Sequence, residues 1–265
     1  MLVRGLFDRC VRGLGVAAVL AAAPAAAETV TLATLTWPPY TGRELPAGGA
    51  VTDVVKRVFA KAGHETRVVY RPWNRAIVKA KRPDNGVVGY YPGYHCRHDP
   101  SASFHRSGVL GIRPIGFAKR DDAPFSWSDL EDLEGFRIGT VVGYANTRAF
   151  DRKAEAQELW TIPAQSDRAN LRKLTKGLLN YAVIDRNVLS YLMSTDPKLR
   201  EHRGEITMAE TPLGEMPLFV CFRDSERGRR LLRTFNETLG KLEAREMLKA
   251  RMKELMADVR PIPQE

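Results

Sequence analysis

Short apolar or alternating runs recur along the chain and predict β-strands. The first, residues 29–35, alternates β-branched and apolar side chains with a period of two, as a half-buried strand does. The motif Trp37-Pro38-Pro39-Tyr40 follows it and cannot continue a strand or a helix. Similar runs predict seven further strands, at residues 66–70, 86–91, 109–119, 137–143, 161–164, 181–184 and 216–222.

Apolar residues spaced three and four apart predict helices between these strands. In residues 51–62, Val51, Val54 and Val58 fall on one helical face, and Gly63 ends the segment. Further helices are predicted at residues 73–81, 147–156, 167–176, 186–193, 226–239 and 243–256, with Asp167 as a candidate cap. Alternating strands and helices favour an α/β fold with mostly parallel strands.

The predicted elements form two successive α/β units. Two extended runs, residues 109–119 and 216–222, lie where the chain passes from one unit to the other. This order predicts two lobes joined by a two-stranded hinge. In such an arrangement a ligand binds between the lobes, at loops that follow the strands.

The N-terminal segment has the pattern of a cleaved secretory signal. Arg4, Arg9 and Arg12 precede the small, apolar run 13–23, and Ala25-Ala26-Ala27 fits the small-residue rule for cleavage. The apolar run is shorter than the roughly 20 residues that span a bilayer. We therefore expect residues 1–27 to be removed, which leaves 238 of 265 residues, and the mature protein to reach the periplasm.

Charge argues against a nucleic-acid partner. The chain has 41 Lys and Arg against 31 Asp and Glu, a formal net charge of +10, and the predicted signal accounts for 2 of it. Basic and acidic residues are interleaved, with no basic block. We expect a monomer without a cofactor, whose basic surface suits anionic ligands.

Two cysteines, Cys96 and Cys221, lie beyond the predicted signal. Export permits a disulfide, but a sequence does not show whether two cysteines are close, so we expect two free thiols. His95, Cys96, His98 and His105 lie close together along the chain and leave open a metal-binding function, although their spacing matches no standard zinc motif.

Four segments in this order, residues 34–42, 72–76, 130–139 and 182–185, resemble the family 3 extracellular solute-binding proteins, the amino-acid-binding subunits of ABC importers. The resemblance covers essentially the whole mature chain. It implies a type II periplasmic-binding fold, with two α/β lobes joined by a two-stranded hinge near residues 116–119 and 212–218. The implied division is a signal peptide at 1–27, a first lobe of 28–117 and 216–265, and an inserted second lobe of 118–215.

The resemblance also implies a ligand site. Arg97 would bind a carboxylate, Asp185 an ammonium group, and the helix start near Asn146 an anion. Asp185 and Asn146 also lie where helices need N-caps, Trp73 also suits a core position, and Arg97 also suits a solvated loop. The full set of candidate ligand-binding residues is Trp37, Tyr40, Trp73, Tyr90, Tyr91, Arg97, Gly143, Tyr144, Asn146, Thr147 and Asp185.

The loop after residue 89 departs from the family pattern. Aromatic residues, among them Tyr90, Tyr91 and Tyr94, replace the usual Ser- and Thr-rich approach to the arginine. The expected ligand is therefore a small polar solute, either an amino acid or a related organic acid.

The expected function is non-catalytic binding for an ABC importer by closure of the lobes, with a membrane permease or receptor as partner. A dehydratase-like enzyme on the same fold is a competing hypothesis, for which only Asp99 and Asp185 are evident acids. No nucleophile-elbow motif supports hydrolysis. A periplasmic protein that binds a metal or senses a ligand would also be consistent with the sequence.

Overall fold

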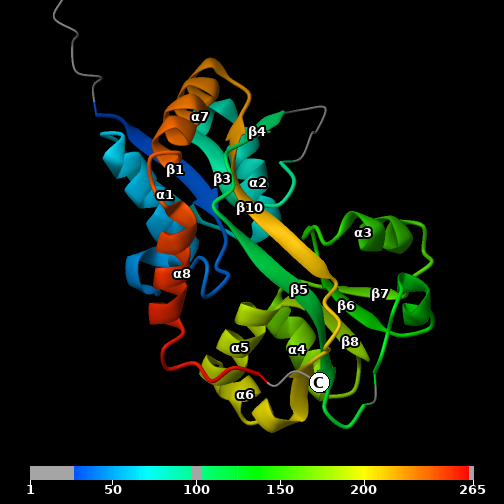
Figure 1. The fold of residues 1–265 in the computed structure, drawn as a ribbon. Helices are drawn as coiled ribbons and strands as arrows, with labels where there is room; N and C mark the ends of the chain where they lie inside the picture. The colour runs from blue at the N-terminus through cyan, green and yellow to red at the C-terminus, as the bar shows by residue number, and fades with distance from the viewer. Residues whose placement is uncertain (1–26, 97–102, 124, 263–265) are drawn as a thin grey trace, which may run out of the picture.

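The computed structural model describes residues 27–96, 103–123 and 125–262, and in these two α/β lobes share two long strands (Figure 1). The predicted signal segment lies outside the described residues, apart from Ala27. Within them, no helix is both long and apolar enough to cross a membrane.

The first lobe is built on a sheet with helices on its faces (Figure 1). Its strands are β1 (Thr29–Thr34), β2 (Glu65–Tyr70), β3 (Val87–Gly93), β4 (Phe104–Arg106) and the last part of β10 (Gly214–Arg223). Its helices are α1 (Ala50–Lys61), α2 (Trp73–Lys81), α7 (Glu226–Leu239) and α8 (Ala244–Leu255).

The second lobe repeats this layering of helices on a sheet. They are β5 (Gly111–Arg120), which begins beside β10, β6 (Ile138–Val141), β7 (Thr161–Ala164), β8 (Tyr181–Asp185) and β9 (Ile206–Met208). Its helices are α3 (Arg148–Glu155), α4 (Asp167–Thr175), α5 (Arg186–Thr195) and α6 (Pro197–Arg200).

Strands β5 and β10 connect the lobes. They pair antiparallel with each other over residues 111–115 and 214–218. Beyond this stretch β5 pairs with β8 in the second lobe and β10 pairs with β3 in the first, so the strand order is β2-β1-β3-β10-β5-β8-β6-β7. The predicted pairing of the two extended runs is confirmed, but residues 116–119, expected at the hinge, pair with β8. The exact lobe boundaries stay a prediction.

The strands that run through the core are buried along most of their length. Fully buried Leu32, Val88, Phe117 and Leu218 come from four different strands, and every residue of β3 is buried. Helices cover both faces of such strands, which explains their nearly continuous apolar sequence. The elements that the sequence missed, β4, β9 and α6, are three or four residues long, too short to show a period.

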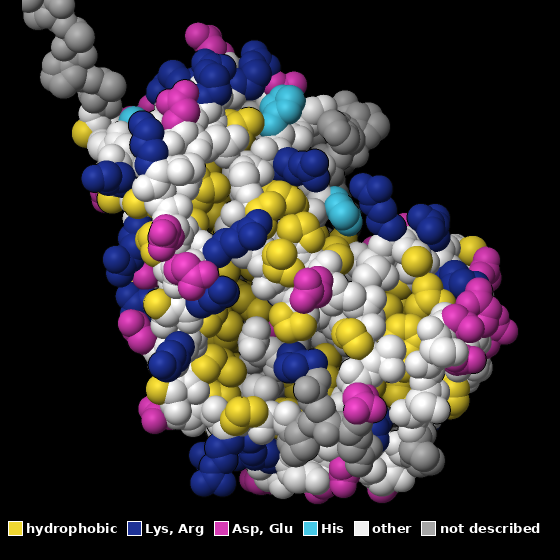
Figure 2. All heavy atoms as spheres, viewed as in Figure 1, with side chains coloured by type: hydrophobic (Ala, Val, Ile, Leu, Met, Phe, Trp, Pro, Cys, Tyr) yellow, Lys and Arg dark blue, Asp and Glu magenta, His cyan; other side chains and the backbone are white. Residues whose placement is uncertain are grey.

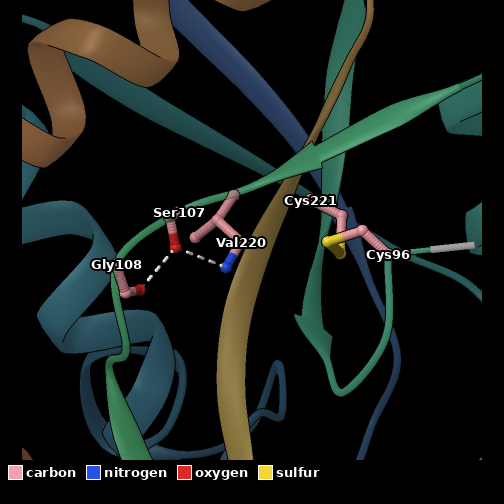
Figure 3. Close-up of a disulfide and its surroundings, with 5 residues drawn as sticks. All are labelled: Cys96, Ser107, Gly108, Val220 and Cys221. Atoms are coloured by element: carbon pink, nitrogen blue, oxygen red, sulfur yellow. Dashed lines mark hydrogen bonds between the residues drawn. A yellow bond between two sulfur atoms is a disulfide. The ribbon is translucent and has the colours of Figure 1, made fainter.

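A disulfide joins Cys96, in the loop that follows β3, to Cys221 on β10 (Figure 3). The expectation of two free thiols is therefore wrong, because the antiparallel pairing of β3 with β10 brings residues 125 apart in sequence to a Cα separation of 5.4 Å. Gly93 is required beside it, since a Cβ atom there would lie 2.4 Å from the Cys221 sulfur.

The disulfide also removes Cys96 as a thiolate ligand, which weakens the metal-binding hypothesis. His105 faces Asp224, with Nε2 3.1 Å from Oδ1, and His98 lies outside the described residues. Close by, Ser107 Oγ donates to the Gly108 carbonyl and accepts from Val220 N, at 2.7 and 3.0 Å (Figure 3). These bonds anchor the segment before β5 to β10.

The C-terminal tail forms a third connection between the lobes. After α8 the chain runs from the first lobe to α5 and α6 of the second (Figure 1). Arg203 donates to the carbonyls of Arg260 and Pro261 at 2.6 and 2.9 Å, and Ile262 N donates to Ser190 Oγ at 3.3 Å. The division expected from the sequence places this tail in the first lobe, whereas its contacts are with the second.

Candidate functional site

Arg113, on β5, is a buried cation at the junction of the lobes, and only 2% of its surface is exposed. Its guanidinium carbon lies 4.2 Å from the ring centre of Tyr94 and 5.2 Å from that of Trp37, within the range of cation–π attraction. One terminal nitrogen is 3.7 Å from the Asp185 carboxylate. Its Nε–H is buried without a hydrogen-bond partner in the described part of the chain.

Asp185 ends β8 and caps α5, one of the two roles that the sequence left open, while its binding of an ammonium group stays a prediction. Its Oδ1 caps α5 by accepting from the N–H groups of Asn187 and Val188, at 2.7 and 3.0 Å. Its Oδ2 faces the lobe junction and accepts from the hydroxyl of Tyr40 at 3.0 Å. Burial raises the pKa of Asp185, while nearby Arg113 and the hydrogen bonds lower it.

Asp167 is a second buried carboxylate beside Arg113, a role that the sequence did not reveal. The predicted cap of α4 at Asp167 is wrong, because the side chain of Ser166 caps that helix and accepts from Ala169 N. Burial, together with the charge of Asp185, raises the pKa of Asp167 to about 7, although Arg113 opposes the shift. The cluster is therefore near its point of protonation at neutral pH.

Aromatic rings enclose these charges. Trp37 stacks on Tyr40 with ring centres 4.4 Å apart and meets the edge of Tyr94 at 6.3 Å. The Trp37 N–H approaches Asp167 closely enough to lower its pKa, but it has no well-aligned hydrogen-bond acceptor among the described residues. A cavity of about 10 Å³, room for about one water molecule, is lined by Leu35, Trp37, Trp73, Pro92, Tyr94 and Tyr144.

The two lobes touch through direct hydrogen bonds. Besides the bond to Asp185, Tyr40 accepts from Asn187 Nδ2 at 2.8 Å. Trp73 Nε1 donates to the carbonyl of Gly143 at 3.0 Å. Gly143 has a φ of +81°, and a Cβ there would lie 2.0 Å from the side chain of Asn74 across the junction. Only glycine permits this approach.

Two of the predicted aromatic residues pack within the first lobe. Tyr90 packs edge-on against Phe104 at 5.0 Å, and the hydroxyl of Tyr91 bonds Thr52 on α1 at 3.1 Å. Successive residues of a strand point to opposite faces, so these tyrosines fill the core on the two sides of β3. Tyr94, just beyond the strand, reaches Arg113 instead.

At the predicted anion site near the start of α3, the donors of Asn146 already have partners. The backbone N–H and side-chain amide of Asn146 both donate to Asp151, at 2.9 and 3.0 Å. The cap of α3 is Thr147, whose hydroxyl accepts from Phe150 N at 3.4 Å. Tyr144 does face the junction, where burial and then the charge of Asp167 raise its pKa. Arg97 lies outside the described residues.

The buried charges suit a ligand that carries both signs. Two carboxylates and one guanidinium sum to −1 when all are ionised, and to zero when Asp167 is protonated. The carboxylates can accept from an ammonium group, and the Nε–H of Arg113 can donate to a carboxylate. One signal for Arg113 was present in the sequence, since it is a cation between the uncharged stretches 109–112 and 114–118, and buried charges need partners.

Solved structures share this architecture at low sequence identity. The amino acid ABC transporter substrate-binding protein AbpA from Streptococcus pneumoniae, bound to L-arginine, has a TM-score of 0.66 and 11% identity, over 88% of this chain and 96% of its own. The GluR0 ligand-binding core from Nostoc punctiforme, in complex with L-glutamate, has a TM-score of 0.65 and 16% identity, over 85% and 98%.

A histidine kinase sensor domain with similarity to periplasmic binding proteins gives a TM-score of 0.65 and 16% identity, over 89% of this chain and 98% of its own. No family model matches the chain, and no curated protein matches its sequence. The structural matches confirm the predicted fold class, a two-lobed periplasmic-binding fold. They include proteins bound to amino acids of opposite charge, so the shared fold does not by itself specify a ligand.

Proposed function

We propose that this protein binds a small zwitterionic solute, an α-amino acid or a close relative, between its two lobes. The observation that carries the proposal is the buried cluster of Arg113, Asp167 and Asp185, enclosed by Trp37 and Tyr94. The same fold binds amino acids in the proteins of Streptococcus and Nostoc described above.

Complementary charges give each end of such a ligand a partner. A carboxylate would accept from the Nε–H of Arg113 and the indole N–H of Trp37, two buried donors without a good acceptor in the described structure. An ammonium group would donate to Asp167 and Asp185. Satisfying buried donors is worth more than adding a hydrogen bond at the surface, because their desolvation cost has already been met.

Binding requires the lobes to separate first. The cavity of about 10 Å³ is far smaller than an amino acid. Opening would break the hydrogen bonds from Tyr40 to Asp185 and from Trp73 to Gly143, while β5 and β10 flex. Closure on a ligand that touches both lobes would then restore these contacts, which is how binding shifts the population toward the closed form.

The cellular role that fits this binding is delivery of the solute to an ABC permease from the periplasm. The signal-like pattern of residues 1–27 and the substrate-binding proteins among the structural neighbours support it. A strain without the protein should lose high-affinity uptake of the ligand that the purified protein binds.

Calorimetric titration tests the binding site directly. Wild-type protein is titrated with the twenty amino acids, small organic acids and polyamines, and we expect one amino acid or close analogue to bind. Arg113→Met and Asp185→Asn should each weaken that ligand at least a hundredfold, since either change leaves a buried charge unpaired. Arg97→Ala, the clamp expected from the family resemblance, provides the comparison. Unchanged affinity in the first two variants, with the fold intact, would reject this cluster as the site.

Ligand sensing is the second candidate, because one structural neighbour is a histidine kinase sensor domain. It uses the same binding site but a different membrane partner. Deletion of the protein would then leave uptake of the ligand unchanged and abolish a ligand-dependent transcriptional response. The two measurements in one strain separate the two roles.

A further inference from the structure

A groove of about 440 Å³ lies beside the hinge and contacts both lobes. Helix α8 of the first lobe forms one side of the groove. The start of α5 in the second lobe and residues of the C-terminal tail form the other side. Its volume falls within the range of about 300–1,000 Å³ typical of small-molecule sites. Its lining includes Tyr40, Ile112, Arg186, Asn187, Met252 and Lys253.

The groove combines an apolar floor with positive charge. Ile112, Leu248, Met252 and Met256 supply apolar surface, and Ile112 is 49% exposed although it lies in a strand. Figure 2 shows hydrophobic side chains along the boundary between α8 and the second lobe, with Lys and Arg side chains beside them. An apolar surface at such a boundary is typical of a binding site.

Of the residues that the structure describes, three cations and no acidic residue line the groove. Arg186 has a buried Nε–H with no hydrogen-bond partner among these residues. Lys249 is paired with Glu246, which lies outside the lining, at 2.8 Å. This leaves positive charge, and one unsatisfied buried donor, next to the apolar floor.

We propose that this groove is a second binding site, for a small amphipathic anion with a carboxylate on an apolar chain or ring. The carboxylate would accept from Arg186 and Lys253, and the apolar part would cover Ile112 and Met252. Burying such a chain yields about 25 cal/mol for each Å² removed from water. A cation of the same shape would meet only like charges.

The site is coupled to the lobe junction through shared residues. Tyr40 and Asn187 line the groove, and the same two side chains form the hydrogen bonds that join the lobes at Asp185. A ligand in the groove therefore stabilises one relative position of the lobes. The anion in the groove would therefore change the affinity of the junction for the amino acid. By linkage, the amino acid would change the affinity of the groove for the anion by the same factor.

Octanoate, below its aggregation concentration, is the probe for calorimetry and thermal unfolding of the wild-type protein. We expect saturable 1:1 binding and a rise in melting temperature, with no binding of octylammonium and much weaker binding of octanol. The double variant Arg186→Gln/Lys253→Gln should weaken octanoate at least tenfold. The control variant Arg245→Gln removes an exposed charge that lies on α8, like Lys253, but outside the groove. It should leave octanoate affinity unchanged.

The variant Arg113→Met separates this proposal from the proposed function, since it should retain octanoate binding while it loses the amino-acid ligand. Absence of octanoate binding to wild type, equal binding of octylammonium, or unchanged binding in a folded double variant would each overturn the site. Binding to phosphatidylglycerol vesicles without binding to octanoate would also overturn it, in favour of a membrane-facing surface.

Discussion

Two neighbouring residues of β5, Arg113 and Ile112, lie in opposite environments, one buried and one partly exposed. Arg113 points into the lobe junction and is almost fully buried, whereas Ile112 points into the groove and is 49% exposed. The alternation of a strand places successive side chains on opposite faces, so one strand that joins the lobes can present a charge to the lobe junction and an apolar surface to the groove. The polar side chain is inside and the apolar one outside, the reverse of the usual pattern.

A charged side chain can be buried where several partners surround it. Arg113 is inside because two carboxylates and two aromatic rings converge on it from both lobes. Burial alone would lower the pKa of Arg113, but Tyr94, Asp185, Tyr40 and Asp167 raise it, so it stays charged. No carboxylate lines the groove in the described part of the chain, and the exposed ends of the lysine side chains remain in water while their stems cover apolar surface.

Removing the buried cation should have the largest effect. Arg113→Met leaves two buried carboxylates without their counter-charge, and we expect a loss of roughly 3–5 kcal/mol in unfolding free energy by urea titration. Ile112→Met, at the next position, should change it by less than about 1.5 kcal/mol. Adding Asp185→Asn to Arg113→Met should recover part of the loss. Equal stability of Arg113→Met and Ile112→Met would show that the two faces of β5 do not differ in this way.

The disulfide should stabilise the whole fold, including the lobe junction and the groove. It closes a loop that contains the whole second lobe, so Cys96→Ala/Cys221→Ala should lower the unfolding free energy by about 2–5 kcal/mol. For a chain of this size the melting temperature should fall by roughly 5–15 °C. Octanoate affinity of the folded variant should not change. A reducing agent that leaves the wild-type melting temperature unaltered would contradict the prediction.

Protonation of Asp167 should change the stability of the lobe junction and should not change the groove. The pKa of Asp167 is raised from its ordinary value of 3.8 to about 7, so its protonated form is favoured in the folded state. This stabilisation is complete below about pH 4 and is lost as the pH rises to about 7, with a slope of at most about 1.4 kcal/mol per pH unit. Asp167→Asn should flatten the unfolding free energy measured between about pH 4 and pH 7. Asp185, whose pKa is also raised by burial, should retain a slope of the same sign.

Removing the hydroxyl of Tyr40, which lies at the lobe junction and also lines the groove, should give the smallest loss of unfolding free energy. Tyr40→Phe removes a hydroxyl that bonds Asp185 and Asn187 but keeps the ring stacked on Trp37. We expect a loss of about 0.5–1.5 kcal/mol per hydrogen bond. Small-angle scattering should show a larger fraction of open molecules. Tyr91→Phe, which removes a buried hydroxyl within the first lobe, is the matched control and should not change the scattering.

Much of the fold could be predicted because its signals are local. The helix predicted at residues 226–239 is found at Glu226–Leu239, and the strand predicted at 161–164 is β7. The pairing of β5 with β10 followed from the order of the elements. Within the site, Trp37, Tyr40 and Asp185 do meet at the lobe junction, since each closely follows or ends a strand that points toward it.

What could not be predicted depends on residues far apart in the sequence. Arg113 and Asp167 meet because β5 and the start of α4 come together, and each alone resembles an ordinary strand cation or helix cap. The disulfide and the crossing of the C-terminal tail depend on the same kind of distant contact.

Local patterns in the sequence therefore predicted most of the elements, their order and the two-lobed class, because hydrophobic period and turn residues act over a few positions. Which charges are buried, which cysteines are joined, and which face of β5 meets which partner are seen only in the folded structure. Those outcomes follow from the packing of distant segments. A buried charge is tolerated only where its partners arrive from several of them at once.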